Sequence, residues 1–197
     1  MNAEHEIILP SPRFEGELSL EEVMKQRRSV REYSRDNITT EEVGQLLWAV
    51  QGITHPRGYR TAPSAGALYP LEIYLVIPAG VYYYDPNVNR LYLHKGGDYR
   101  SELHVVTLEQ DSIKDASAVF VITAVYERIE AKYGADRGPR YVYIEVGHAA
   151  QNLLLQATAL GLSGVPVGAF YDEQVKRVLS LPQDHQPLYL IPVGPPK

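Results

Sequence analysis

Residues 141–160 read YVYIEVGHAAQNLLLQATAL and form the longest helical pattern of the chain. Most of the surface of this helix is apolar, and a helix that is apolar nearly all round is buried nearly all round. Gly161 follows directly, where a left-handed residue commonly ends a helix. A single subunit of 197 residues rarely hides such a helix completely. The stretch therefore predicts a large interface between subunits.

Four polar residues interrupt this apolar surface and fall on one face of the helix: Glu145, His148, Asn152 and Gln156. The ordinary interpretation is a solvated stripe, as on most amphipathic helices. The alternative is a set of polar contacts across a dimer or towards a cofactor. The sequence leaves both interpretations open.

The elements on either side of the long helix indicate an α+β fold. Residues 118–125 are uncharged and rich in β-branched side chains, which is typical of a buried central strand. A hairpin is expected around Asp85-Pro86-Asn87, between strands at 81–84 and 90–94. Other strands are expected at 72–77, 165–170 and 188–193. Helices are expected from a Ser19 cap to 28, from a Thr40 cap to Gly52, from an Asp98 cap to 107, at 126–133 and at 172–179.

The length suits one domain. Residues 1–18 are expected to form an N-terminal arm, and residues 19–197 a single domain. The arm lacks a basic start, so it does not resemble a signal peptide. Residues 53–70 form a long loop rich in Gly, Pro, Ser and Thr, and such loops are often functional.

Composition excludes several classes of function. The net charge of -5 argues against a nucleic-acid partner. The absence of cysteine removes disulfides, thiolate nucleophiles and Cys-ligated metals, and favours a cytoplasmic location. No apolar run is pure enough to predict a membrane span. The six histidines lack metal-binding spacing, so no metal is expected, and no nucleophile elbow, P-loop or dinucleotide fingerprint occurs.

The main basic cluster of this acidic chain follows the first predicted helix. It contains Arg27, Arg28, Ser29 and Arg31, with Lys25 and Arg35 close by in sequence. Guanidinium groups bind phosphate through paired hydrogen bonds, so the cluster is a candidate phosphate site. The alternative is a solvated helix end, where cations interact favourably with the helix dipole.

Two segments of small residues are further candidates for a binding site. Pro63, Ser64, Ala65 and Gly66 lie in the long loop, where small side chains let a ligand approach the backbone. The second segment, at the end of a predicted strand, consists of Val165, Pro166, Val167, Gly168 and Ala169. It could leave space for a flat ring. Each segment also suits an ordinary structural turn.

Taken in order, these segments resemble the nitroreductase-like FMN oxidoreductases, and more narrowly their SagB-type dehydrogenase branch. The resemblance extends over about residues 19–195. It rests on RRSVR (27–31), PSAGALYP (63–70) with EIY (72–74), GVYYYD (80–85), KYG (132–134), RY (140–141), GHAAQNL (147–153), GVPVGAF (164–170) and PVG (192–194).

The resemblance implies a sandwich with a central, mostly antiparallel sheet flanked by helices. It also implies an interlocked homodimer with two FMN sites between the subunits. Arg27, Arg28, Ser29 and Arg31 would hold the phosphate and ribityl chain, and residues 63–66 would come from the partner subunit. Residues 165–169 would lie against the flavin ring. Lys197 is the one basic residue after residues 192–194 that could reach the phosphate.

The resemblance further implies a two-step cycle in which NADH or NADPH reduces FMN and a quinone, nitro compound or similar small molecule is then reduced. In the branch that oxidises azoline rings in peptides, a Lys-Tyr pair serves in proton removal, and Lys132-Tyr133 matches it. That pair equally suits an ordinary helix end. A peptide or organic-substrate dehydrogenase is therefore the alternative, and a flavin-binding protein without turnover is a further one. An acidic interaction protein that no longer binds flavin is the last alternative.

Overall fold

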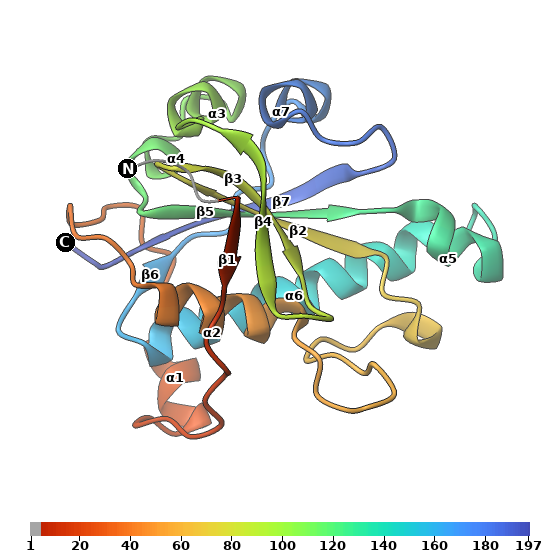
Figure 1. Cartoon of the computed structure of the whole chain (residues 1–197), viewed down its shortest axis with the longest axis horizontal. Helices are drawn as coiled ribbons and strands as arrows, with labels where there is room; N and C mark the ends of the chain where they lie inside the picture. Colours follow the sequence, from red (N-terminus) through yellow and green to blue (C-terminus); the bar gives the residue numbers. More distant parts are fainter. Residues whose placement is uncertain (1–4) are drawn as a thin grey trace.

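Seven strands form one sheet in the computed structural model, which describes residues 5–197 (Figure 1). The strand order is β1-β4-β3-β2-β5-β7-β6, and the neighbouring strands run antiparallel. The strands are β1 (Glu6–Ile8), β2 (Leu71–Ile77), β3 (Gly80–Asp85), β4 (Arg90–Gly96), β5 (Ala118–Ala124), β6 (Ser163–Gly164) and β7 (Gln186–Gly194). The predicted α+β class with a mostly antiparallel sheet flanked by helices is confirmed.

Helices cover both faces of the sheet (Figure 1). The long helix α6 (Gly138–Ala159) lies across one face and packs against α1 (Leu20–Gln26), α2 (Thr40–Gln51) and α5 (Tyr126–Tyr133). The opposite face carries α3 (Arg100–Val106), α4 (Asp111–Asp115) and α7 (Asp172–Leu179). One 3-10 turn, η1 (Ala65–Ala67), interrupts the loop between α2 and β2.

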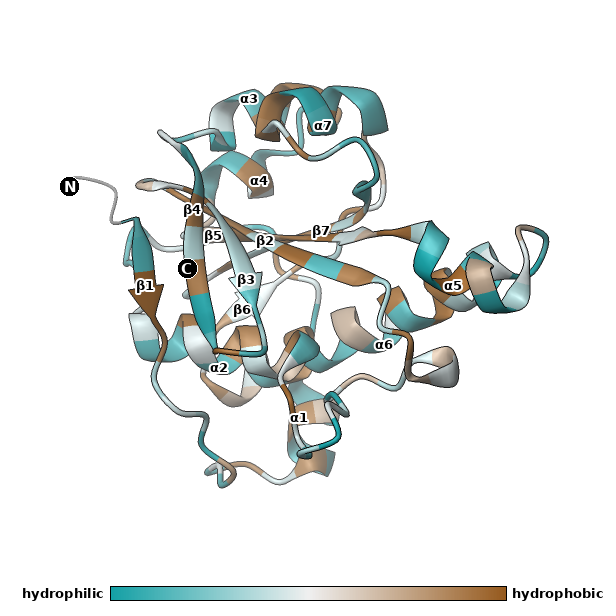
Figure 2. Ribbon diagram, turned by 45° about the vertical axis from the view of Figure 1, so that its right-hand side comes forward, coloured by the Kyte–Doolittle hydropathy of each residue, from teal (hydrophilic) through white to brown (hydrophobic). Residues whose placement is uncertain are grey.

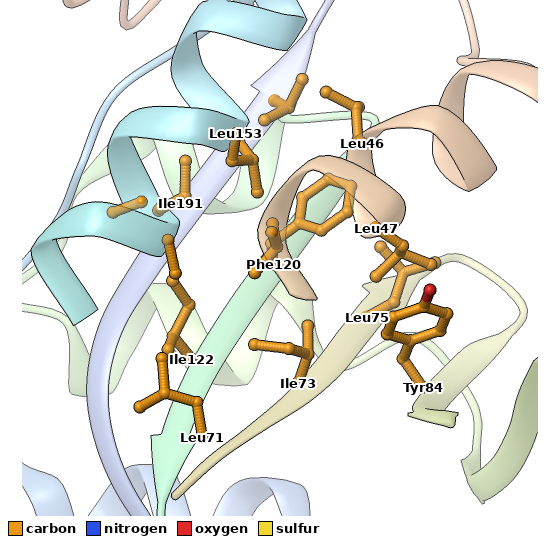
Figure 3. Packing of buried hydrophobic residues seen from close by; sticks show 14 of the residues in the cluster. Leu46, Leu47, Leu71, Ile73, Leu75, Tyr84, Phe120, Ile122, Leu153 and Ile191 are labelled. Atoms are coloured by element: carbon orange, nitrogen blue, oxygen red, sulfur yellow. The ribbon is translucent and has the colours of Figure 1, made fainter. Parts of the chain in front are cut away.

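The two layers of helices create two cores. On the α2 and α6 side, Leu47 and Leu153 meet Phe120 and Ile122 of β5, and all four are fully buried (Figure 3). On the other side, Val121 of β5 joins a second buried cluster with residues of α3 and α7. Because alternate residues of a strand face opposite sides, β5 is buried on both, as its uncharged sequence predicted. Figure 2 shows brown, hydrophobic residues along β5 in the middle of the sheet.

Most helix ends follow the sequence signals, with small shifts. Ser19 caps α1 in a complete capping box with Glu22. Thr39, not Thr40, caps α2, because its hydroxyl accepts from the Glu42 amide at 3.1 Å while Glu42 bonds back to Thr39. The α3 cap position is Tyr99, one residue after the predicted Asp98. Helix α6 begins at Gly138, and Gly161 has the predicted left-handed conformation with φ 73°.

The predicted strand at 165–170 is wrong. The regular ladder of β6 ends at Gly164, and beyond it an isolated bridge joins Val167 to Leu190. The Val165 amide still donates to the Pro192 carbonyl at 3.3 Å, but Pro192 has no amide hydrogen to donate back to Val165, so the ladder is interrupted there. This segment therefore follows the edge of β7 as irregular backbone.

The predicted arm contributes the edge strand β1, whose Ile7 lies opposite Leu91 of β4. Residues 1–4 of the arm lie outside the described residues. The division into an arm and one domain remains a prediction. Among residues 5–197, no helix has the length and apolar character required to cross a membrane.

Candidate functional site

Two of the three predicted site segments lie side by side. Ser29 forms a parallel bridge with Gly164, and the Val30 amide donates to the Gly164 carbonyl at 3.2 Å. The Tyr33 hydroxyl then donates to the Val30 and Pro192 carbonyls at 3.0 and 3.1 Å. Residues 27–31 are thereby fixed against the loop that begins at β6 and against the end of β7.

The basic residues of this region face solvent. Arg28, Ser29 and Arg31 are exposed, and Arg27 is half-buried. Within residues 5–197, no ion pair neutralises Arg27, Arg28 or Arg31. The Arg28 guanidinium donates to the Lys25 and Arg27 carbonyls, both at 2.8 Å, so it also caps the end of α1. Both interpretations of the cluster thus have support, and the charge remains available to an anion.

Lys197 lies near this cluster. The chain end is held by a bridge between Pro196 and Tyr33 and by a bond from the Ser34 amide to the Pro195 carbonyl at 2.9 Å. The Lys197 ammonium is 3.7 Å from the Glu32 carboxylate, and both side chains are largely exposed. An exposed pair of this kind contributes little to stability, so Lys197 can exchange Glu32 for another anion.

The third predicted segment, residues 165–169, contributes exposed backbone. Val167 and Leu190 exchange two hydrogen bonds, of 2.8 and 3.0 Å, which hold the segment 165–169 beside β7. Gly168 and Ala169 come next and are exposed, whereas Val165 and Val167 are buried and Pro166 is half-buried. Gly168 and Ala169 therefore expose backbone beside β7, where a Cβ at Gly168 would lie 3.6 Å from the Tyr189 ring.

The loop segment 63–66 is strained and well anchored. The Tyr69 amide donates to the Ser64 hydroxyl oxygen at 2.9 Å. Positive φ values occur at Gly66 (65°), Ala67 (54°) and Tyr69 (47°), and the last two are not glycines. Strained backbone persists only where the surrounding structure enforces it, and it gathers at functional sites.

Lys132 and Tyr133, the predicted catalytic pair, meet this segment at Gly66. A Cβ atom at Gly66 would lie 2.8 Å from Lys132 Nζ and 2.9 Å from the Tyr133 hydroxyl oxygen. The positive φ of 65° favours glycine at this position, and a larger residue would also have to displace the ends of these two side chains. The last residues of α5 therefore place an ammonium and a phenol at a predicted binding segment.

The single chain does not bring all the predicted residues together. The Asn152 amide of α6 donates to the Thr61 carbonyl at 3.3 Å, so the loop before Ser64 runs along the middle of this helix. In Figure 1, the gold turn η1 lies on the side of α5, whereas α1 and the residues that follow it lie on the opposite side. Residues 63–66 and 27–31 are thus separate within one subunit.

Glu145 occupies an unexpected position in the polar stripe of α6. Its side chain is 1% exposed, and neither carboxylate oxygen accepts a hydrogen bond of good geometry. Burial raises its pKa to about 7, although the Ser64 hydroxyl, Arg60 and the Gln51 amide act to lower it. The solvated-stripe interpretation is therefore wrong for Glu145, whereas His148 is exposed in the single chain and fits either interpretation.

The sequence patterns did not single out Arg60 or Gln51 as site residues. Arg60 Nη1 donates to Gln51 Oε1 at 2.8 Å, and its guanidinium lies 4.8 Å from the centre of the Tyr69 ring. A lone charged residue between Tyr59 and Thr61 was the one available signal. No group of three or more metal-ligating side chains occurs within residues 5–197.

Comparisons with known proteins agree with this geometry. A Methanocaldococcus jannaschii protein named as a nitroreductase is 45% identical over 184 residues, which cover 90% of this chain and 91% of the relative. A Ralstonia eutropha JMP134 protein of the same name superposes with a TM-score of 0.91 at 29% identity, over 99% of this chain and 91% of that chain.

Two more distant proteins share parts of this similarity. The NADPH:FMN oxidoreductase of Vibrio harveyi, complexed with NAD+, has the same fold with a TM-score of 0.68 at 23% identity, over 90% of this chain and 69% of that chain. The trifolitoxin-processing protein of Rhizobium leguminosarum bv. trifolii is 27% identical over 141 residues, which cover 62% of this chain and 35% of the relative.

The nitroreductase family model matches residues 24–195, which include each of the site segments described above. Both the family match and the similarity to the Methanocaldococcus jannaschii protein span most of the chain. The chain belongs to the nitroreductase family.

Proposed function

We propose that this protein is an FMN-dependent oxidoreductase that uses NADH or NADPH to reduce a quinone, a nitro compound or a similar small molecule. The observation that carries the proposal is the junction of residues 27–31 with residues 164–169. It joins unpaired, exposed guanidinium groups to exposed backbone at Gly168 and Ala169. The name of the Vibrio harveyi protein supports FMN and a nicotinamide donor for this fold.

The residues fit a flavin mononucleotide. Arg27, Arg28 and Arg31 would bind its phosphate, because guanidinium groups hold phosphate oxygens through paired hydrogen bonds. Ser29, held beside Gly164, would donate a further hydrogen bond. Lys197 lies close enough to the 27–34 segment to add a positive charge. The ring would lie against residues 165–169, where a larger side chain at Gly168 or Ala169 would project into the open surface.

Two features of the single chain support a homodimer. The middle of α6 leaves apolar side chains uncovered, because Tyr143 is 59% and Ile144 50% exposed. Gly147, one turn on, has nothing within 4 Å of a would-be Cβ, so another helix could approach closely there. We therefore propose that a second subunit covers this face and supplies its residues 63–66 to the site.

When bound, FMN would supply the hydride chemistry between a nicotinamide donor and an acceptor, and Arg27, Arg28 and Arg31 would hold it through its phosphate. The residues of the chain would bind and orient the cofactor and the substrate. The Lys132 ammonium and the Tyr133 hydroxyl hold exchangeable protons beside Gly66. Either group could therefore deliver or remove a proton at a substrate held near this loop.

A second candidate function rests on that pair. One relative of this chain is named as a trifolitoxin-processing protein, which supports a role in processing a larger substrate. A SagB-type dehydrogenase would oxidise an azoline ring in a peptide, with Lys132 or Tyr133 removing the proton. A flavin-binding role without turnover is the further alternative. Location in the cytoplasm remains a prediction from the cysteine-free sequence.

One set of anaerobic experiments separates these functions. We expect purified protein reconstituted with FMN to bind it tightly, and NADH or NADPH to bleach the bound flavin. Reduction of a quinone or nitro compound should then restore the colour. Bound flavin that neither donor reduces would contradict the reductase and leave the dehydrogenase, for which flavin bleaching by an azoline peptide is the test.

A further inference from the structure

The buried carboxylate of Glu145 interacts with groups from two other parts of the chain. Ser64 and Arg60 belong to the loop before β2, and Gln51 ends α2. Glu145 is already 1% exposed in a single chain, so its burial does not depend on a partner subunit. A buried carboxylate without good hydrogen bonds is costly, and such groups are retained where they serve a function.

The hydrogen-bond pattern of Ser64 explains what this carboxylate could do. The Ser64 oxygen accepts from the Tyr69 amide at 2.9 Å, which leaves the hydroxyl hydrogen free to donate elsewhere. Ser64 is half-buried, and its hydroxyl acts on the buried Glu145 carboxylate, whose pKa it lowers. An ionised carboxylate attracts the hydroxyl hydrogen inward, whereas a protonated one competes for it only weakly.

We propose that Glu145 is a positioning residue that holds the Ser64 hydroxyl inward when ionised and releases it towards the cofactor when protonated. The proposal rests on the proposed function, in which Ser64 contributes to a flavin site. Glu145 does not touch the substrate or the cofactor in this account. It acts through Ser64 on the segment 63–66.

The surroundings of Glu145 allow it to change charge near neutral pH. Burial is the largest influence and favours the neutral form, while Ser64, Arg60 and Gln51 favour the charged one. Gln51 is 1% exposed, and its amide nitrogen has no hydrogen-bond partner among the described residues. Other titratable groups lie close by. Glu72 and Arg128 act on Arg60, and Lys132 and Tyr133 approach Gly66. Tyr141 and His148 lie one turn away from Glu145 on α6.

The first test is the affinity for FMN between pH 6 and 8, measured by quenching of flavin fluorescence. The wild-type Kd should rise roughly three- to tenfold over this range, the value of one hydrogen bond. Glu145→Gln and Ser64→Ala should each give a Kd that changes little with pH, and the double variant should add nothing. The exposed Glu127→Gln control should retain the wild-type profile.

A pH-independent wild-type Kd, or a Glu145→Gln protein with the wild-type profile, would overturn the proposal. The second test needs no cofactor and no Glu145 variant. In Ser64→Ala the charged Glu145 carboxylate loses a hydrogen-bond donor, so the pKa of Glu145 in the folded protein should rise. The pH at which the unfolding free energy falls should therefore be higher than in wild type. An unchanged midpoint overturns the coupling. Failure of every variant to bind FMN would instead refute the proposed function.

Discussion

Replacing Glu145 by glutamine should change how the stability of the flavin-free protein depends on pH. In the folded protein burial raises the pKa of Glu145 to about 7, from an ordinary value of 4.5. The folded state therefore binds this proton more tightly than the unfolded state. Its contribution to stability is present below pH 4.5 and is lost as the pH rises to about 7.

The size of the effect follows from the shift. One pKa unit corresponds to about 1.4 kcal/mol, so wild type should lose about 2.5 kcal/mol of unfolding free energy from this group between pH 5 and 8. Glutamine cannot ionise, so the Glu145→Gln protein does not lose this unfolding free energy as the pH rises. The Glu145→Gln protein should therefore become more stable relative to wild type as the pH rises.

Urea unfolding at a series of pH values, followed by circular dichroism, measures this difference directly. The Glu127→Gln variant removes an exposed carboxylate from α5 and should track wild type within a few tenths of a kcal/mol, as most surface substitutions do. Parallel curves for wild type and Glu145→Gln from pH 5 to 8 would refute the assignment of a buried, titrating carboxylate.

Three further variants address the site. Arg31→Ala should weaken FMN binding by about 1.5–3 kcal/mol, the value of a hydrogen bond to a charged group. The control variant Arg57→Ala, which changes an exposed arginine, should leave the Kd for FMN unchanged. Equal Kd values for wild type and Arg31→Ala would show that Arg31 is not part of the phosphate site. Gly66→Ala and Gly58→Ala both place a side chain at positive φ (65° and 79°), and within residues 5–197 the Cβ at 58 has no neighbour within 4 Å whereas the Cβ at 66 lies 2.9 Å from the Tyr133 hydroxyl; since side-chain ends can move aside, thermal unfolding should show a modestly larger loss in Gly66→Ala, and an equal loss would show that this contact yields freely. Lys132→Met should leave hydride transfer from NADPH to FMN within about threefold of wild type if the protein is a reductase; abolished oxidation of an azoline peptide would instead place Lys132 in a dehydrogenase.

The sequence predicted the elements whose signals are local. Helix α7 has the predicted bounds, and the hairpin of β3 and β4 surrounds the predicted turn. Ser19 was recognised as a cap because its partner Glu22 is only three residues away. Strand β5 was recognised because burial on both faces removes every charge from a strand.

The features that were missed depend on contacts between distant parts of the chain. The segment 165–170 looked like a strand by composition, yet Pro192 of β7 cannot donate a hydrogen bond to Val165, which interrupts the ladder beyond Gly164. Glu145 looked like part of a solvated face, because nothing local reveals that the loop at 60–64 folds back over α6. The approach of Lys132 to Gly66 likewise arises from a fold that joins residues 66 positions apart.

The site was accessible from sequence only through family resemblance. Residues 27–31 alone suited a helix end as well as a phosphate site, and the Arg28 guanidinium does cap α1. In the structure Ser29 pairs with Gly164, so the two segments that were each a weak signal in the sequence lie side by side. No periodicity or spacing predicts a contact between residues so far apart in the chain.

The most direct test of the central claim is the anaerobic visible spectrum of FMN-reconstituted protein before and after addition of NADPH and NADH. The account predicts bound flavin absorption that one or both donors bleach, and that a quinone or nitro compound restores. Absence of flavin absorption after reconstitution with FMN would contradict the assignment of the 27–31 and 165–169 surface as a flavin site.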